Sequence, residues 1–216
     1  MAVVSPCRPE YAEECRLVVK IGVLGLQGDF AKHVEMLNKL DYVDALVVRT
    51  PEEIRLCDGL IIPGGESTTV GKLMARYGVD EAIRERAAEG MPIFGTCTGM
   101  ILLAKDIEDS DQNRLGLMDI TVRRNAFGRQ VDSFETDLAI PLICDSKPIR
   151  AVFIRAPIVT KVYGDAEVTA RLDSGEIVMV KQGNCLAAAF HPELTDDVRV
   201  HAYFVQIAKI VCIGKR

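Results

Sequence analysis

The chain has 216 residues, of which 49% are hydrophobic, and it carries a formal net charge of −5. This length and composition suit a single domain with a large core, whereas the acidic balance excludes the basic footprint of a nucleic-acid-binding protein. No run approaches the roughly 18 apolar residues of a membrane span, and residues 1–14 lack the apolar stretch of a secretory signal. We therefore expect neither nucleic acid nor a membrane among its partners.

Seven cysteines are present, an odd number, and no two of them form a C-x-x-C pair. This pattern argues against a disulfide framework and against a zinc ribbon, and it favours a reducing cytoplasm. Cys57, Cys185 and Cys212 have aliphatic neighbours and are expected to lie in the core. Neither a dinucleotide-binding nor a P-loop glycine pattern occurs. We expect no metal ion and no cofactor.

Strands and helices alternate in the first half of the chain. Residues 1–16 show no periodicity, and we expect a poorly ordered N-terminal extension before a single domain at 17–216. Apolar, β-branched runs predict buried strands at 17–24, 44–48, 59–62 and 92–94. Helices are predicted at 30–40, after residue 67 and at 80–89, with N-caps at Asp29 and at Ser67 or Thr68. This order predicts a parallel sheet with helices on both faces.

The second half of the chain has a different pattern, without regular alternation. Strands are predicted at 119–123, 131–134, 151–155 and 185–190, with a hairpin formed by 168–171 and 177–181 and a final helix at 197–211. No linker divides the chain. The sequence thus predicts one flavodoxin-like, three-layer α/β domain, with a mostly parallel central sheet and an added antiparallel part in the second half.

A cysteine stands between two glycines where a predicted strand gives way to a helix. Gly95 and Gly99 flank Cys97 in the pattern G-x-C-x-G, the cysteine form of a nucleophile elbow. Such a turn holds the sulfur at a helix N-terminus, where a thiolate is favoured. The alternative is a buried cysteine that acts as a small hydrophobic residue.

Loops that follow the predicted parallel strands should meet at one rim of the sheet. These are residues 25–28, 63–67 and 96–99. The second of them contains Gly64-Gly65, which can aim a backbone N–H at a developing oxyanion, with the N–H of Thr98 as the other donor. Alternatively, the two glycines only make a tight turn.

One of the three histidines follows a buried strand and so should lie at this rim. His191 is followed two residues later by Glu193, which in an extended segment leans to the same side. A base with a carboxylate beside it, together with the elbow Cys97, indicates a Cys-His-Glu triad. The alternative is a histidine that closes a strand beside a solvated glutamate. His33 and His201 fall within helices and are expected to be partly exposed and not catalytic.

Several segments together resemble the class I, triad-type glutamine amidotransferases, and in particular the glutaminase subunit of the two-component pyridoxal 5'-phosphate synthase. The resemblance runs from about residue 20 to the end of the chain. It is carried by residues 22–28 (GVLGLQG), 63–69 (PGGESTT), 94–97 (FGTC), 124–135 (RNAFGRQVDSFE), 153–157 (FIRAP) and 190–195 (FHPELT).

The resemblance implies hydrolysis of L-glutamine to L-glutamate and ammonia, with the ammonia passed to a separate synthase subunit in a hetero-oligomer. It implies that Cys97 forms a glutamyl thioester, that His191 protonates the leaving ammonia and then activates water, and that Glu193 holds the imidazole. Gln27 is the candidate for the partner interface, and docking is expected to complete the oxyanion site formed by Gly65 and Thr98. The positions that match glutamine-binding residues of the family are Gly65, Glu66, Ser67, Arg124, Ile154 and Arg155.

Three other interpretations stay open at this stage. With the same triad, the chain can supply ammonia to another acceptor, in histidine or nucleotide biosynthesis, or it can be a free-standing γ-glutamyl hydrolase. A flavodoxin-like regulatory domain with an inert thiol needs no triad. Arg124 and Arg155 can instead form surface or structural ion pairs. The sequence also departs from the family at Thr98, where alanine is frequent, and in residues 1–16, which have no counterpart.

Overall fold

The computed structural model describes residues 17–126, 133–143 and 147–215. The predicted N-terminal extension and the first two residues of the strand predicted at 131–134 lie outside these ranges. Its strands are β1 (Val19–Leu24), β2 (Val43–Val48), β3 (Gly59–Ile62), β4 (Ile93–Thr96), β5 (Ala104–Ile107), β6 (Met118–Arg123), β7 (Ser133–Leu138), β8 (Ile149–Ile154), β9 (Ile158–Val162), β10 (Glu167–Arg171), β11 (Ile177–Gln182) and β12 (Cys185–Ala188). Its helices are α1 (Phe30–Leu37), α2 (Pro51–Arg55), α3 (Ser67–Tyr77), α4 (Val79–Ala88), α5 (Thr98–Leu103), the 3-10 turn η3 (Pro192–Leu194) and α6 (Arg199–Gly214).

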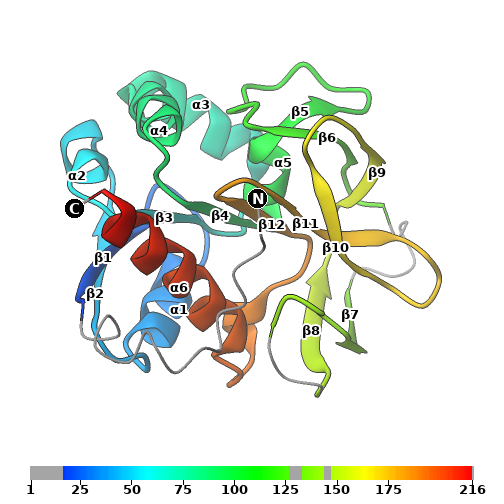
Figure 1. Ribbon diagram of the computed structural model, residues 1–216. Coiled ribbons are helices and arrows are strands. Elements are labelled where there is room, and N and C mark those ends of the chain that lie inside the picture. Colours follow the sequence, from blue (N-terminus) through cyan, green and yellow to red (C-terminus); the bar gives the residue numbers. More distant parts are fainter. Residues whose placement is uncertain (1–16, 127–132, 144–146, 216) are drawn as a thin grey trace.

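One large sheet organises the described part of the chain (Figure 1). Ten of the described strands form it, nine of them in the order β2-β1-β3-β4-β12-β11-β9-β6-β5, with β10 paired to β11. The run from β2 to β12 is parallel, whereas β11 pairs antiparallel with β12, β9 and β10. Strands β7 and β8 form a separate antiparallel pair. The last strand, β12, therefore returns to lie beside β4, the strand that leads to Cys97.

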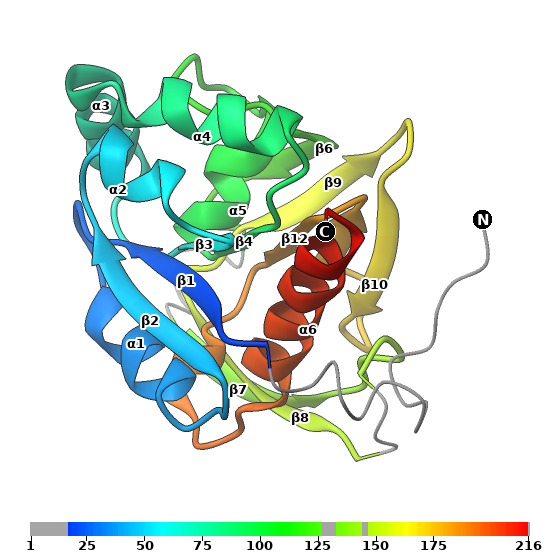
Figure 2. The ribbon, with the colours of Figure 1, turned by 60° about the vertical axis from the view of Figure 1, so that its left-hand side comes forward.

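Helices cover both faces of the parallel region, as Figures 1 and 2 show. Helices α1 and α6 lie on one face, and α3, α4 and α5 lie on the other. Strands β3 and β4 are buried along their whole length, which is why their sequences are continuous apolar or small-residue runs without polar alternation. The predicted architecture, a three-layer α/β domain with an antiparallel part in the second half, is confirmed.

Several local details differ from the predictions. The N-cap of α3 is Glu66, because its carboxylate accepts hydrogen bonds from the N–H groups of Thr68 and Thr69. Asp29 occupies the N-cap position of α1, as predicted, but its side chain makes no capping hydrogen bond. Cys57 lies in the core as expected, whereas Cys185 and Cys212 are only partly buried. The short elements α2, β5 and β9 were not predicted.

The turn from β4 to α5 is crowded on every side. A Cβ atom added to Gly99 would overlap the carbonyl oxygen of Ile62 on β3, and one added to Gly95 would overlap the backbone of Gly99. These are backbone obstacles, which cannot rotate away as a flexible side chain can. The two glycines of the G-x-C-x-G pattern are therefore required for the helix to pack against two strands at once.

We expect Gly99→Ala to destabilise the chain by about 2 kcal/mol or more, because overpacking against fixed backbone forces strands and helix apart. The free energy of unfolding, measured with urea, tests this. Gly214→Ala is the matched control, since nothing lies within 4 Å of the Cβ position at the end of α6. Equal urea midpoints for the two variants would contradict the account of the turn.

Candidate active site

Cys97 occupies a strained turn between β4 and α5. Its backbone has φ 48° and ψ −100°, a left-handed φ that residues other than glycine rarely adopt and that costs of order 1–3 kcal/mol. The turn is held by a hydrogen bond of 2.8 Å from its N–H to the carbonyl of Ala188, at the end of β12. The thiol lies 3.9 Å from the carbonyl oxygen of Ile154. Cys97 is 7% exposed and lines the pocket described next.

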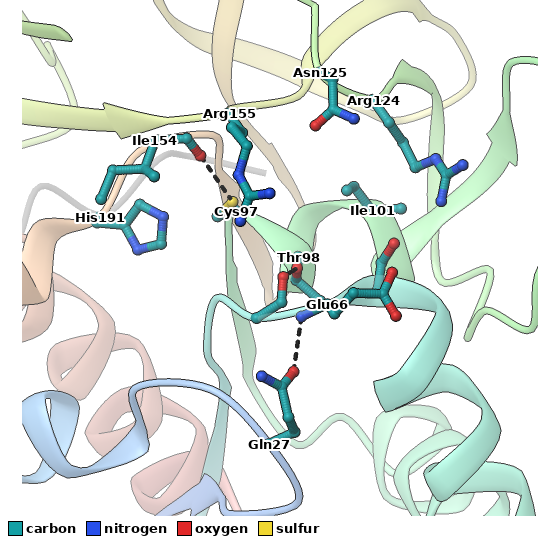
Figure 3. A pocket seen from close by; sticks show the side chains of 12 residues that line it. Gln27, Glu66, Cys97, Thr98, Ile101, Arg124, Asn125, Ile154, Arg155 and His191 are labelled. Carbon is teal, nitrogen blue, oxygen red and sulfur yellow. Dashed lines mark hydrogen bonds between the residues drawn. The ribbon is translucent and has the colours of Figure 1, made fainter. Parts of the chain in front are cut away.

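A pocket of about 360 Å³ opens above the elbow (Figure 3). Its walls come from the loops after β1, β3, β4 and β12, with further residues from the ends of β6 and β8. Figure 3 shows His191 on one side of Cys97 and Arg124 on the other. The lining residues are Gln27, Gly65, Glu66, Ser67, Cys97, Thr98, Ile101, Arg124, Asn125, Ile154, Arg155 and His191. The structure thus brings together every candidate residue except Glu193, which lies behind His191.

The contact between His191 and Glu193 forms in a way that the sequence did not indicate. His191 Nδ1 lies 2.7 Å from Glu193 Oε1, but the segment is a 3-10 turn, so the expectation of an extended segment is wrong. Pro192 at the first position of the turn has the fixed φ that a helix start requires. The turn brings the carboxylate back towards the ring, and a hydrogen bond of 2.8 Å from the His191 N–H to Val152 O anchors it.

The electrostatics of this pair favour an ion pair at neutral pH. Burial opposes protonation of His191, but its interactions with Glu193 and with the neighbouring Cys97 outweigh burial and raise its pKa to about 10. Burial likewise opposes ionisation of Glu193, yet His33 and His191 hold its pKa below the usual value. A cationic imidazole thus stands beside the Cys97 sulfur, the setting in which a cysteine acts as a nucleophile.

The loop after β3, which contains Gly64 and Gly65, is held by two hydrogen bonds on a single peptide group. The carbonyl of Gly65 accepts a hydrogen bond of 2.5 Å from the Thr98 hydroxyl. The N–H of Glu66, on the other edge of that peptide, donates to Gln27 Oε1 at 2.7 Å (Figure 3). The sequence predicted a role for the backbone N–H of Thr98, whereas in the structure its hydroxyl also holds this loop.

The N–H of Gly65 belongs to the preceding peptide group. The Gly64 carbonyl oxygen lies where a Cβ of Gly28 would stand, and no cis peptide bond is present in the described residues. Because the N–H of a trans peptide points away from the carbonyl, the Gly65 N–H points away from Gly28.

Arg124 and Arg155 supply positive charge to the pocket. Within the described ranges neither guanidinium forms an ion pair with a carboxylate of the chain, which disfavours the structural ion pairs left open above. Arg124 is oriented by Gln112, whose Oε1 accepts from Arg124 Nη1 at 2.7 Å. Gln112 also accepts from the hydroxyl of Ser67, at 3.2 Å. No sequence signal pointed to Gln112.

Glu66 presents a carboxylate to the same pocket. Its hydrogen bond from the Thr69 hydroxyl, with those from backbone N–H groups of α3, lowers its pKa to about 2. The pocket therefore offers cationic and anionic groups together.

His33 and His201 are fully buried, so the expectation that both are partly exposed is wrong. His33 lies on α1 three residues after Phe30 and four before Leu37, which places it on the inward face of the helix. That spacing is the signal that could have revealed its burial. His33 Nδ1 lies 2.9 Å from His201 Nε2 on α6.

The part of the chain that the structure describes contains neither a candidate metal site nor a membrane-spanning helix. No group of three or more histidine, cysteine, aspartate or glutamate side chains is arranged to hold a metal ion. None of the helices has the length and apolar character needed to cross a bilayer.

The chain is similar to known proteins along most of its length. The model of the SNO glutamine amidotransferase family matches residues 23–210. A protein of Carboxydothermus hydrogenoformans named pyridoxal 5'-phosphate synthase subunit PdxT is 55% identical over 188 residues, covering 87% of this chain and 97% of the relative. Its namesake from Herpetosiphon aurantiacus is 57% identical over 188 residues, covering 86% and 98%. A crystal structure described as a glutamine amidotransferase matches with a TM-score of 0.80 and 47% identity, covering 87% of this chain and 98% of that one.

We expect iodoacetamide at pH 8 to label Cys97 faster than Cys57 or Cys185, by about tenfold or more, because the thiolate is the reacting species. Burial raises the pKa of Cys57 and of Cys185 to about 11. Mass spectrometry of digested peptides measures the rates, and labelling in urea is the control, since unfolding should make the three rates equal. Similar rates in the folded protein would contradict a reactive Cys97.

Proposed function

The chain belongs to the SNO glutamine amidotransferase family, and we propose that Cys97, His191 and Glu193 carry out its reaction. The enzyme hydrolyses L-glutamine to L-glutamate and ammonia and supplies the ammonia to pyridoxal 5'-phosphate synthase. One observation supports the choice of residues: His191 lines the same pocket as Cys97, and its Nδ1 lies 2.7 Å from Glu193 Oε1.

In the proposed first step, the thiolate of Cys97 attacks the side-chain amide carbon of glutamine. The N–H groups of Thr98 and Gly65 stabilise the oxyanion that forms. The carbon–nitrogen bond then breaks as His191 gives its proton to the leaving nitrogen, so that ammonia departs and a glutamyl thioester remains.

In the second step, neutral His191 takes a proton from water, and the water oxygen attacks the thioester carbon. Glutamate leaves and the thiolate is restored. Glu193 holds one imidazole tautomer throughout and stabilises its cationic form.

The charges in the pocket suit glutamine, which has an α-carboxylate and an α-ammonium group. We assign the α-carboxylate to Arg124 or Arg155, because a guanidinium binds a carboxylate with two parallel hydrogen bonds. The carboxylate of Glu66 is available for the α-ammonium group. Gly65, Ser67 and Ile154 complete the proposed glutamine site, and Ile154 also offers its carbonyl oxygen to the thiol.

The chain is proposed to work as one subunit of a hetero-oligomer in the cytoplasm, with no nucleic-acid partner. The relatives are named as subunits of a synthase, and a reducing compartment keeps the catalytic thiol available. We place the synthase at the rim around Gln27, because this side chain holds the Gly65–Glu66 peptide beside the oxyanion site.

We expect Cys97→Ala to abolish pyridoxal phosphate formation from glutamine, by loss of the nucleophile, while formation from added ammonium salt continues. The assay uses the complex with its synthase subunit and follows both product and ammonia. Cys185→Ala is the control, because it removes a thiol outside the pocket. Glutamine hydrolysis by the Cys97→Ala complex at the wild-type rate would refute the assignment.

We expect the chain alone to hydrolyse glutamine slowly, and the synthase subunit to activate it less in Gln27→Ala than in the wild type. The physical reason is loss of the acceptor that orients the Glu66 N–H. The activation is measured as kcat for glutamine hydrolysis while increasing amounts of the synthase subunit are added. Lys32→Ala, which changes an exposed pair with Glu35, is the control. Full turnover by the chain alone, or unaltered activation of Gln27→Ala, would disprove the role of this rim.

A further inference from the structure

The proposed mechanism uses only one of the chain's three histidines. His33 and His201 are 0% exposed and line no part of the pocket. Burial of an imidazole is costly unless its polar atoms find partners. The partners of these two rings lead directly to the proposed triad.

His33 stands on the far side of Glu193 from His191. His33 Nε2 lies 3.3 Å from Glu193 Oε2 and 3.2 Å from Thr96 Oγ1. Glu193 Oε2 is buried and makes no hydrogen bond of standard geometry in the described part of the chain, so the ion-pair contact with His33 Nε2 is what faces this oxygen. Glu193 Oε1 is already bound to His191. The carboxylate thus lies between two imidazoles, one for each oxygen.

The positions of the protons follow from these contacts. Ionised Glu193 only accepts hydrogen bonds, so His33 Nε2 is the donor. Burial lowers the pKa of His33, which is therefore neutral and has no proton on Nδ1. That atom accepts from His201 Nε2, 2.9 Å away.

His201 fits the same arrangement. Burial and the neighbouring His33 lower its pKa to about 3. Its Nδ1 has no partner within the described ranges, as expected for a lone pair and not for a buried N–H. The two buried rings then form a chain of donors, in which His201 donates to His33 and His33 points its own N–H towards Glu193.

We propose that His33 is a positioning residue of the glutaminase reaction: it donates to Glu193 Oε2 and so fixes the carboxylate that orients His191 towards Cys97. This inference rests on the proposed function. A carboxylate held at both oxygens cannot rotate about its terminal bond, whereas one held at a single oxygen can, and His191 would turn with it. His201 supports His33 by occupying its Nδ1.

The first test leaves the chain unaltered. With three histidines in all, ¹⁵N-histidine labelling gives three rings whose protonated and bare nitrogens are distinguished by NMR in the complex or the full chain. We expect His33 to have its proton on Nε2 and a bare Nδ1. A bare Nε2 on His33 would overturn the proposal, because that atom would then have nothing to donate.

The second test compares two variants in the complex with the synthase subunit. We expect His33→Leu to lower kcat for glutamine hydrolysis about ten- to a hundredfold, the range typical when the outer partner of a functional ligand is removed. KM for glutamine should be unchanged, because His33 does not line the pocket. His33→Gln should recover most of the loss, since its amide offers a donor to Glu193 and an acceptor to His201.

Thermal unfolding and Thr169→Val serve as controls for folding. Thr169 is a buried polar residue on β10 away from the pocket, and loss of its hydroxyl should leave kcat unchanged. A folded His33→Leu with wild-type kcat, or equal losses in His33→Leu and His33→Gln, would overturn the proposal. Where His33→Leu fails to fold, the NMR result on the unaltered chain decides. An inactive wild-type complex would instead refute the glutaminase assignment and leave the tautomers readable.

Discussion

The strained turn at Cys97 is the constraint on which the site depends. The nucleophile candidate has a left-handed φ because β4 ends against β3 and α5 begins within one residue of it. A larger residue at Gly95 or Gly99 would separate these elements. The strain is balanced by burial of the surrounding apolar residues, which lie on strands covered by helices on both faces. The sulfur is thus fixed by the core and not by the loops around it.

The sheet order brings the second requirement, a base, to the same edge. Strand β12 is far from β4 in the sequence but pairs with it in parallel, Ala188 opposite Thr96. Both strands therefore end at the same rim, where one continues into Cys97 and the other into His191. The antiparallel strands that follow in the sheet extend it without disturbing this pairing. The fold supplies the geometry, while the side chains at the rim supply the chemistry.

Much of this was predictable from the sequence, because buried parallel strands leave strong signals. The runs at 59–62 and 92–94 are apolar throughout, and the glycines around Cys97 mark the elbow. The signal fails where structure is local or exposed. Strand β5 is buried only at its ends and half of its residues are charged, so it resembles the end of a helix. Glu66 caps α3 in preference to Ser67, because its longer side chain reaches two N–H groups. The helical spacing of His33 could have revealed its burial, but its contact with Glu193 was not predictable, because tertiary structure alone brings the two residues together.

The peptide between Gly65 and Glu66 has a mechanical consequence. Its carbonyl is bound by the helix that follows the nucleophile, and its N–H by the loop after β1. A peptide group is a rigid plane, so its two edges turn together. Rotation of this peptide group would therefore disturb both hydrogen bonds together. A movement of the loop after β1 is thus transmitted to α5 through a single planar group.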